Sequence, residues 1–196
     1  MRLGVLGGTF DPPHVGHLIA AVDAYEALEL DRVLLVPSAV HPFKQGRVRA
    51  PAELRAEMAR AAVAGDERFE VEEMELRRTG PSYTVDTLRA LRERWPDAEI
   101  FFLVGADNVR DFPAWREPEE VARLARLVVV SRAGEGESPE LPFPFLTLSV
   151  TRVDVSATEI RRRAGAGQSI RYLVPEAVRE IVEREGLYGD ADLIRK

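Results

Sequence analysis

The chain has 196 residues, no cysteine and a formal net charge of −6. This length suits one domain over residues 1–196, large enough to bury about 70% of the surface that the unfolded chain would expose. The lack of cysteine excludes disulfides, thiolate metal sites and thiol nucleophiles, and the acidic balance argues against sequence-independent binding of nucleic acid, which needs basic surfaces.

The sequence shows no segment that would enter a membrane. No apolar run approaches the roughly 20 residues needed to cross a bilayer, and no charged segment followed by an apolar stretch stands at its start. We therefore expect a cytoplasmic protein with no membrane or nucleic-acid partner. A small anionic substrate is compatible with the composition. The sequence does not decide whether the protein forms a homo-oligomer.

Apolar strand-like runs alternate with amphipathic helical runs, which is typical of a parallel sheet covered by helices on both faces. We expect a Rossmann-like three-layer α/β/α sandwich with two C-terminal helices, and ligands bound beyond the carboxyl ends of the strands. Residues 133–144 are rich in Gly, Pro, Ser and Glu and predict an exposed loop. Strands are expected at residues 2–6, 32–37, 69–72, 100–104, 127–131 and 145–148, and helices at residues 15–28, 51–64, 85–95, 117–124, 156–164 and 175–185.

Residues 7–17, Gly-Gly-Thr-Phe-Asp-Pro-Pro-His-Val-Gly-His, join the first strand to the first helix. Gly7 and Gly8 predict a sharp turn that brings backbone close to a ligand, and the positive helix N-terminus favours phosphate. His14 and His17 share one helical face, where we expect them to stay protonated near an anion. The alternatives are a plain turn with surface histidines, or a partial metal site of a hydrolase that needs a third ligand.

This run resembles the signature of the HxGH nucleotidyltransferase superfamily, which includes the cytidylyltransferases, pantetheine-phosphate adenylyltransferase and the nicotinate mononucleotide adenylyltransferases. The resemblance implies that His14 and His17 bind the phosphates of ATP. Class I aminoacyl-tRNA synthetases share the signature, but the chain is too short for an anticodon-binding domain and has no K-M-S-K-S loop. The residues of this run that the resemblance places at ATP are Gly7, Gly8, Thr9, Phe10, His14 and His17, with Thr9 also near the second substrate.

A second anchor lies at residues 155–161, Val-Ser-Ala-Thr-Glu-Ile-Arg. Ser156 and Glu159 form the S-x-x-E capping box that any helix can use. A capped N-terminus still presents N–H groups to an anion, and an arginine can donate a charge-assisted fork to a phosphate. The segment is similar to the superfamily's I-S-S-T-x-x-R motif, and the resemblance implies that Ser156, Thr158 and Arg161 hold the outer phosphates of ATP.

Three further stretches resemble the nicotinate mononucleotide adenylyltransferases in particular. Residues 80–88, Gly-Pro-Ser-Tyr-Thr-Val-Asp-Thr-Leu, match that family's G-P-S-Y-T-x-D-T-L, and residues 105–107 match its G-A-D. Trp115, after Phe-Pro-Ala, matches the tryptophan that stacks on the pyridine ring in that family. Without the resemblance, these stretches predict a helix cap and a strand-end cap, and a lone tryptophan predicts a core residue. The resemblance implies mononucleotide contacts at Ser82, Tyr83, Thr84 and Trp115, and ATP contacts at Gly105 and Asp107.

One departure follows the second strand, where the family commonly has P-P-H-K and this chain has His41-Pro42-Phe43-Lys44. Phe43 replaces the histidine of that motif. The resemblance implies that Lys44 contacts phosphate. It implies two roles for this lysine, one in catalysis and one in binding the mononucleotide. The role of His41 stays open.

The resemblance implies adenylyl transfer from ATP to nicotinate mononucleotide, which gives nicotinate adenine dinucleotide and pyrophosphate in NAD biosynthesis. A phosphate monoester is mostly ionised at neutral pH, so direct in-line attack needs no strong base. Mg²⁺ is expected on the substrate phosphates, because the sequence offers no dedicated metal cage. The alternatives are pantetheine-phosphate adenylyltransferase and a non-catalytic nucleotide sensor, and acid or amide preference stays open. The implied catalytic residues are His14, His17, Lys44 and Arg161.

Overall fold

The computed structural model describes residues 1–42, 46, 48–109, 111–132 and 141–189. The strands in these residues are β1 (Arg2–Gly8), β2 (Arg32–Pro37), β3 (Phe69–Val71), β4 (Glu99–Gly105), β5 (Arg126–Arg132) and β6 (Phe145–Val150). They form a sheet in the order β3-β2-β1-β4-β5-β6, and every neighbouring pair is parallel. The predicted α/β class with a parallel sheet is confirmed.

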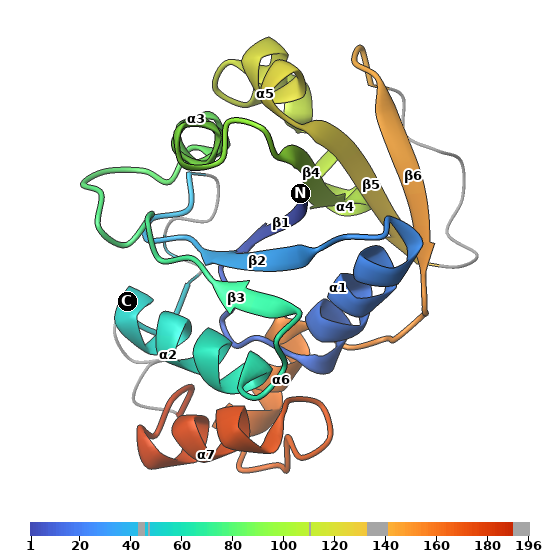
Figure 1. Ribbon diagram of the computed structural model, residues 1–196. Helices are drawn as coiled ribbons and strands as arrows, with labels where there is room; N and C mark the ends of the chain where they lie inside the picture. The colour runs from blue at the N-terminus through green and yellow to red at the C-terminus, as the bar shows by residue number, and fades with distance from the viewer. Residues whose placement is uncertain (43–45, 47, 110, 133–140, 190–196) are drawn as a thin grey trace.

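The helices are α1 (Val15–Ala27), α2 (Ala52–Val63), α3 (Thr84–Arg94), α4 (Ala106–Val109), α5 (Pro118–Leu124), α6 (Ala157–Gly165) and α7 (Glu176–Arg184), with a 3-10 turn η1 (Phe112–Ala114). Helices cover both faces of the sheet (Figure 1): α3 and α5 pack together on one face, and α1 and α2 lie on the other. α6 and α7 lie beyond α2, and α7 packs on α2. Within the described residues, no helix is both long enough and apolar enough to pass through a bilayer.

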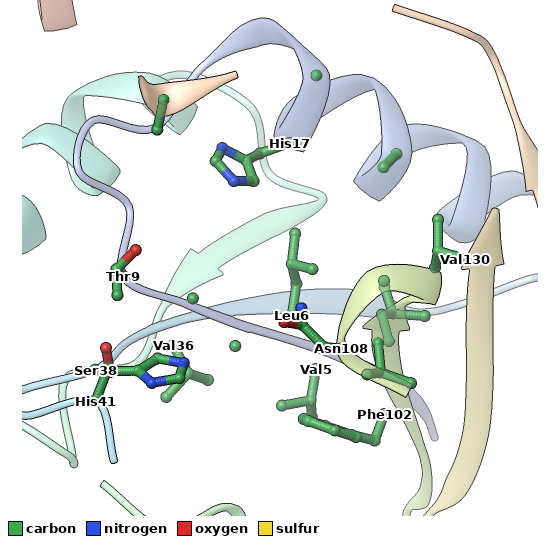
Figure 2. Close-up of a pocket in the computed structure, with 18 of the residues that line it drawn as sticks. Val5, Leu6, Thr9, His17, Val36, Ser38, His41, Phe102, Asn108 and Val130 are labelled. Carbon is green, nitrogen blue, oxygen red and sulfur yellow. The ribbon is translucent and has the colours of Figure 1, made fainter. Parts of the chain in front are cut away.

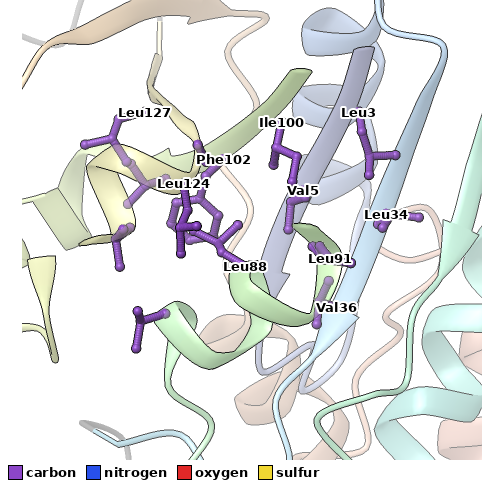
Figure 3. Packing of buried hydrophobic residues seen from close by; sticks show 14 of the residues in the cluster. Leu3, Val5, Leu34, Val36, Leu88, Leu91, Ile100, Phe102, Leu124 and Leu127 are labelled. Atoms are coloured by element: carbon purple, nitrogen blue, oxygen red, sulfur yellow. The ribbon is translucent and has the colours of Figure 1, made fainter. Parts of the chain in front are cut away.

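Alternating side chains of the strands feed two apolar clusters, one on each face of the sheet. Leu34 and Val36 of β2 belong to the cluster that α3 covers with Leu88, as Figure 3 shows. Val33 and Leu35 of the same strand belong to the opposite cluster, beneath α1. A third cluster joins α2, α6 and α7. The sheet is therefore buried on both faces and presents its strand ends to ligands.

The predicted strands and long helices are present, with ends that agree within about two residues, the usual spread at element boundaries. The sequence analysis missed α4 and η1, because pieces of four and three residues are too short to show a period. Residues 133–140 of the predicted loop lie outside the described residues. Its described end is not simply exposed: Leu141 and Phe143 pack against the cluster under α3 and α5.

The glycine pair of the first motif does not form the predicted sharp turn. Gly7 and Gly8 belong to β1, and the left-handed residue is Phe10, with φ 48°. A Cβ on Gly8 would lie 3.2 Å from the Phe10 ring, so the absence of a side chain at Gly8 makes room for that ring. The Phe10 side chain is 1% exposed and packs beneath α1, so that only its backbone is available to a nucleotide.

Candidate active site

The carboxyl ends of β1, β2 and β4 border a cavity of about 680 Å³ (Figure 2). The chain runs outward from β1 through β2 to β3, then returns to β4 on the other side of β1. Where the strand order of a parallel sheet reverses in this way, a crevice opens in which ligands bind. The volume lies within the range of small-molecule sites, roughly 300–1,000 Å³.

Most of the predicted site residues border this cavity. One group comes from β1, the loop after it, α1 and α6, and a second group comes from α3 and the end of η1. The structure thus brings together motifs that lie far apart in the sequence. The predicted residues in the cavity wall are Gly7, Gly8, Thr9, His14, His17, Ser82, Thr84, Gly105, Trp115, Ser156 and Thr158.

Five other predicted residues are not in this group. Phe10 is buried beneath α1, Arg161 is described below, and the remaining three are as follows. Tyr83 is the N-cap residue of α3 and does not line the cavity. Asp107 lies within α4, next to the cavity residue Ala106, but its side chain is outside what the structure describes. Lys44 also lies outside the described residues. The predicted roles of Asp107 and Lys44 therefore remain predictions.

His14 and His17 form a stacked pair at the start of α1. Their ring centroids are 3.7 Å apart with an interplanar angle of 24°, and the His14 backbone N–H donates to Nδ1 of His17 at 3.2 Å. The bond from the His14 backbone holds the His17 ring in one orientation. The expectation that both imidazoles are protonated beside a bound anion stays a prediction. His17 can donate one hydrogen bond, from Nε2, to a phosphoryl oxygen.

Arg161 stands behind the cavity wall and is joined to two residues that form it. Its Nη1 donates to the Asp11 carbonyl at 2.8 Å, and its Nη2 donates to Thr158 Oγ1 at 3.2 Å. These bonds use two of the five N–H donors of a guanidinium. Arg161 is thus held just behind the cavity wall, next to Asp11 and Thr158, and has further N–H donors for an anion.

The predicted helix cap at Ser156 is present. Ser156 is the N-cap residue of α6, and its Oγ accepts from the Glu159 backbone N–H at 3.2 Å. Ser156, Ala157 and Thr158 all line the cavity. A second helix N-terminus therefore faces the same space as α1, and the two partial positive charges add at one end of the cavity.

Arg55 is a buried cation that joins three loops around the cavity. Its guanidinium donates to the carbonyl of Thr9 at 2.6 Å, of Ala39 at 3.0 Å and of Ala50 at 3.1 Å. Burial lowers the pKa of Arg55, and the nearby Asp11 carboxylate opposes that shift. Sequence analysis missed this residue, because an arginine in an amphipathic helix suggests a solvated face.

A second buried ionisable side chain, that of Glu75, lies on the side of the cavity near α3. Glu75 lines the cavity, and its Oε1 accepts from the Thr87 hydroxyl at 2.6 Å. Burial raises the pKa of Glu75, while hydrogen bonds from Thr87 and Ser82 and the charge of Arg78 lower it. Ser82 Oγ also accepts from the Ala39 N–H at 3.0 Å, which fastens the segment before α3 to the segment after β2. Sequence analysis missed Glu75, because it stands in an acidic run.

Trp115 lies on this side of the cavity, on the turn that follows η1. Its ring packs against Phe112, with centroids 5.0 Å apart, and edge-on to Phe102 at 6.0 Å. The neighbouring Arg116 guanidinium lies 4.8 Å from the centroid of the Tyr83 ring, a cation–π contact. These contacts hold the Trp115 turn against the start of α3, so both predicted mononucleotide segments face the same space.

Ser38 and His41 line the cavity beside Thr9, as Figure 2 shows. The Ser38 side chain is 6% exposed, and its hydroxyl has no hydrogen-bond partner among the described residues. A buried hydroxyl normally has a partner, so Ser38 is a candidate ligand contact that the sequence analysis missed. Its position directly after a buried strand was the available signal. His41, whose role the sequence analysis left open, lines the same cavity.

Comparison with known proteins agrees with this geometry. A family model described as cytidylyltransferase-like matches residues 5–163. A Thermus thermophilus protein named probable nicotinate-nucleotide adenylyltransferase is 52% identical over 188 residues, which cover 96% of this chain and 100% of that protein. The chain belongs to the nicotinate-nucleotide adenylyltransferase family. A second member, from Rubrobacter xylanophilus and bearing the same name, is 46% identical over 197 residues and covers 96% of this chain and 92% of its own.

Solved structures support the fold of this nicotinate-nucleotide adenylyltransferase family member. The nicotinic acid mononucleotide adenylyltransferase of Plasmodium falciparum, solved in complex with NaAD, superposes with a TM-score of 0.76. Its sequence is 14% identical, and the match covers 95% of this chain and 97% of that one. The same enzyme complexed with APC gives the same TM-score at 15% identity. The arrangement of strands and helices is therefore shared across distant sequences.

Proposed function

We propose that this chain transfers the adenylyl group of ATP to nicotinate mononucleotide and releases nicotinate adenine dinucleotide and pyrophosphate. The observation that carries the proposal is one cavity lined both by His14 and His17 at the start of α1 and by Ser82, Thr84 and Trp115 near the start of α3. Membership of the nicotinate-nucleotide adenylyltransferase family supports it, as does a neighbour of the same fold that was solved with NaAD.

In the proposed reaction, a phosphate oxygen of the mononucleotide attacks the α-phosphorus of ATP. The new bond joins that oxygen to phosphorus, and the bond from the α-phosphorus to the bridging oxygen breaks, with its electron pair leaving on pyrophosphate. The attacking monoester has a second pKa of about 6 and is already ionised at neutral pH. The protein therefore needs to align two anions and offset their charge rather than remove a proton.

The phosphate end of the cavity supplies donors suited to that task. His17 would donate from Nε2 to the transferring phosphoryl group, and the amino ends of α1 and α6 would add their partial positive charges. Arg161, held by Asp11 and Thr158, would donate to the outer phosphates. Lys44 completes the proposed set on the grounds of its motif alone.

Mg²⁺ is proposed on the phosphate oxygens of ATP. Among the described residues, no group of three His, Asp or Glu side chains could hold a metal ion. The Asp11 carboxylate, which borders the cavity, accepts from the N–H groups of Arg49 and Ala50 and from the Tyr188 hydroxyl. Its oxygens are engaged within the protein, so substrate oxygens are the better ligands for a hard cation, which would supply charge neutralisation there.

The test is product formation by purified protein with ATP and Mg²⁺. Nicotinate mononucleotide, nicotinamide mononucleotide and phosphopantetheine are each supplied alone, with dinucleotide and pyrophosphate measured by chromatography. We expect one pyrophosphate for each nicotinate adenine dinucleotide, and a far lower rate from His17→Ala protein prepared in parallel. Turnover of phosphopantetheine only, or ATP binding with no turnover, would replace the proposal by one of the two alternatives.

A further inference from the structure

The chain segment after α7 folds back toward the loop that carries the histidines. α7 ends at Arg184, and Gly186 follows two residues later with a φ of 59°. The Leu187 N–H donates to the Val182 carbonyl at 3.0 Å, and the Gly186 N–H donates to the Glu183 carbonyl at 3.2 Å. This pair of bonds is the Schellman ending of a helix. It turns the chain so that the next residue, Tyr188, points back into the protein and is buried.

Tyr188 reaches the first motif across 177 positions of sequence. Its hydroxyl donates to Oδ1 of Asp11 at 2.8 Å. Burial and the adjacent Asp11 carboxylate raise the pKa of Tyr188, so the hydroxyl stays protonated and acts as the donor. The Arg49 and Ala50 backbone N–H groups donate to the same carboxylate at 2.7 and 3.1 Å. Asp11 is 2% exposed, and these donors fix its orientation.

Asp11 in turn holds Arg161. The Arg161 guanidinium donates to the Asp11 carbonyl at 2.8 Å, and its Nη1 lies 3.9 Å from Asp11 Oδ2. The Arg161 side chain is 21% exposed, whereas that of the next residue, Arg162, is 57% exposed. A long side chain held by a backbone carbonyl and a carboxylate loses much of its rotamer freedom before a ligand arrives, which lowers the entropic cost of binding.

We propose that Tyr188 is a positioning residue whose hydroxyl orients Asp11 and, through Asp11, sets the Arg161 guanidinium at the phosphate end of the cavity. The inference rests on the proposed function for the identity of the phosphate ligand. It gives a task to Asp11, which belongs to the first motif, and to Tyr188, neither of which takes part in the proposed chemistry.

The test compares Tyr188→Phe, which removes only the hydroxyl, with Tyr172→Phe. Tyr172 lies before α7 and is 84% exposed, so its variant removes a hydroxyl from a tyrosine at the surface. Loss of a hydrogen bond to a charged group corresponds to a factor of about 10 or more in an equilibrium constant. Since only part of that loss reaches Arg161, we expect Tyr188→Phe to raise the KM for ATP by about 5-fold to 10-fold. The KM for the mononucleotide stays unchanged, and Tyr172→Phe matches the wild type.

A double-mutant cycle with Arg161→Lys distinguishes the proposed positioning role of Tyr188 from a purely structural role. If Tyr188 acts through Arg161, Tyr188→Phe adds little to the ATP defect of Arg161→Lys, and the effects are non-additive. Additive effects, or a Tyr188→Phe protein with lower thermal stability but wild-type KM for ATP, would overturn the inference. Direct titration of ATP binding gives a readout that does not depend on turnover, so failure of the proposed function and failure of this inference are distinguishable.

Gly165→Ala provides a second variant, which removes no polar group from the chain. A Cβ at this position would lie 2.6 Å from the Tyr188 carbonyl oxygen, so the Tyr188 segment must shift. We expect the same selective rise in the KM for ATP as in Tyr188→Phe. Wild-type ATP binding in a folded Gly165→Ala protein would contradict the role of the segment.

Discussion

The two stacked imidazoles differ in what each can offer a phosphate. His17 accepts the His14 backbone N–H at Nδ1, which orients the ring so that Nε2 can donate to a ligand. We predict that His17→Ala lowers kcat by about 10²-fold, as expected for loss of one preorganised donor to a developing charge. Steady-state kinetics with both substrates saturating measures this directly. Turnover equal to that of the wild type would remove His17 from the mechanism.

Trp115 is placed to stack on a flat ring at the other end of the cavity. The Trp115 ring packs against Phe112 and Phe102 of the apolar cluster and also lines the cavity. Stacking of a base on an aromatic side chain is worth roughly 1–3 kcal/mol. We therefore expect Trp115→Ala to raise the KM for the mononucleotide by about tenfold or more, with the KM for ATP unchanged. A selective rise in the KM for ATP would contradict the stacking role.

At the scale of elements, a buried carboxyl fastens the segment after β3 to α3. Burial raises the pKa of Glu75 above the ordinary 4.5 of a glutamate, against the hydrogen bonds from Thr87 and Ser82 and the charge of Arg78. Between 4.5 and the raised value, the folded chain binds more protons than the unfolded chain. The contribution of Glu75 to the free energy of unfolding therefore decreases as pH rises through this window.

Glu75→Gln removes this titration and keeps an acceptor for the Thr87 hydroxyl. We predict that the free energy of unfolding of the variant, relative to the wild type, increases as pH rises above about 4.5 and levels off above the folded-state pKa of Glu75. Urea denaturation at several pH values measures the difference. Two stability curves that stay parallel from acid to neutral pH would show that Glu75 titrates normally.

Prediction of elements succeeded where the apolar period was long and failed where local geometry depended on distant contacts. The apolar run at residues 32–37 predicted both ends of β2 to the residue. The turn expected at Gly7 and Gly8 is in fact strand, because the parallel neighbour β2 continues beside both residues and the chain turns only at Phe10. Leu141 and Phe143 follow a polar stretch, and nothing local shows that the far side of the sheet offers them an apolar surface.

At the scale of the whole molecule, Arg55 connects the loops after β1 and β2 with the start of α2. If Arg55 is replaced by an apolar residue, its three carbonyl partners lose their charged donor and Asp11 loses one of its nearby cations. Removal of one partner from a buried charged network costs about 3–5 kcal/mol. We predict that Arg55→Met lowers the free energy of unfolding by roughly this amount, measured by urea denaturation.

The matched control for that prediction is Arg60→Met on the same helix. Arg60 is half exposed and pairs with Glu73 at the surface. Exposed pairs contribute between about 0 and 1 kcal/mol, so the control should unfold close to the wild type. Equal stability of Arg55→Met and Arg60→Met would show that the buried cation does not hold the loops together.

The candidate site was predictable wherever its residues stand in compact strings. Residues 7–17, 82–84 and 156–161 each carry a motif whose neighbours in sequence are its neighbours in space. Arg55 and Tyr188 act on carbonyl and carboxylate groups that lie 46 and 177 positions away, so no local pattern marks them. The whole fold is needed before their chemistry becomes visible.

The central claim is that ATP binds with its phosphates between the amino ends of α1 and α6. A crystal structure of the protein with a non-hydrolysable ATP analogue, Mg²⁺ and nicotinate mononucleotide tests it most directly. The account predicts phosphate oxygens within hydrogen-bond distance of His17 Nε2 and the Arg161 guanidinium, with the pyridine ring beside Trp115. A triphosphate bound elsewhere, out of reach of both histidines, would contradict it.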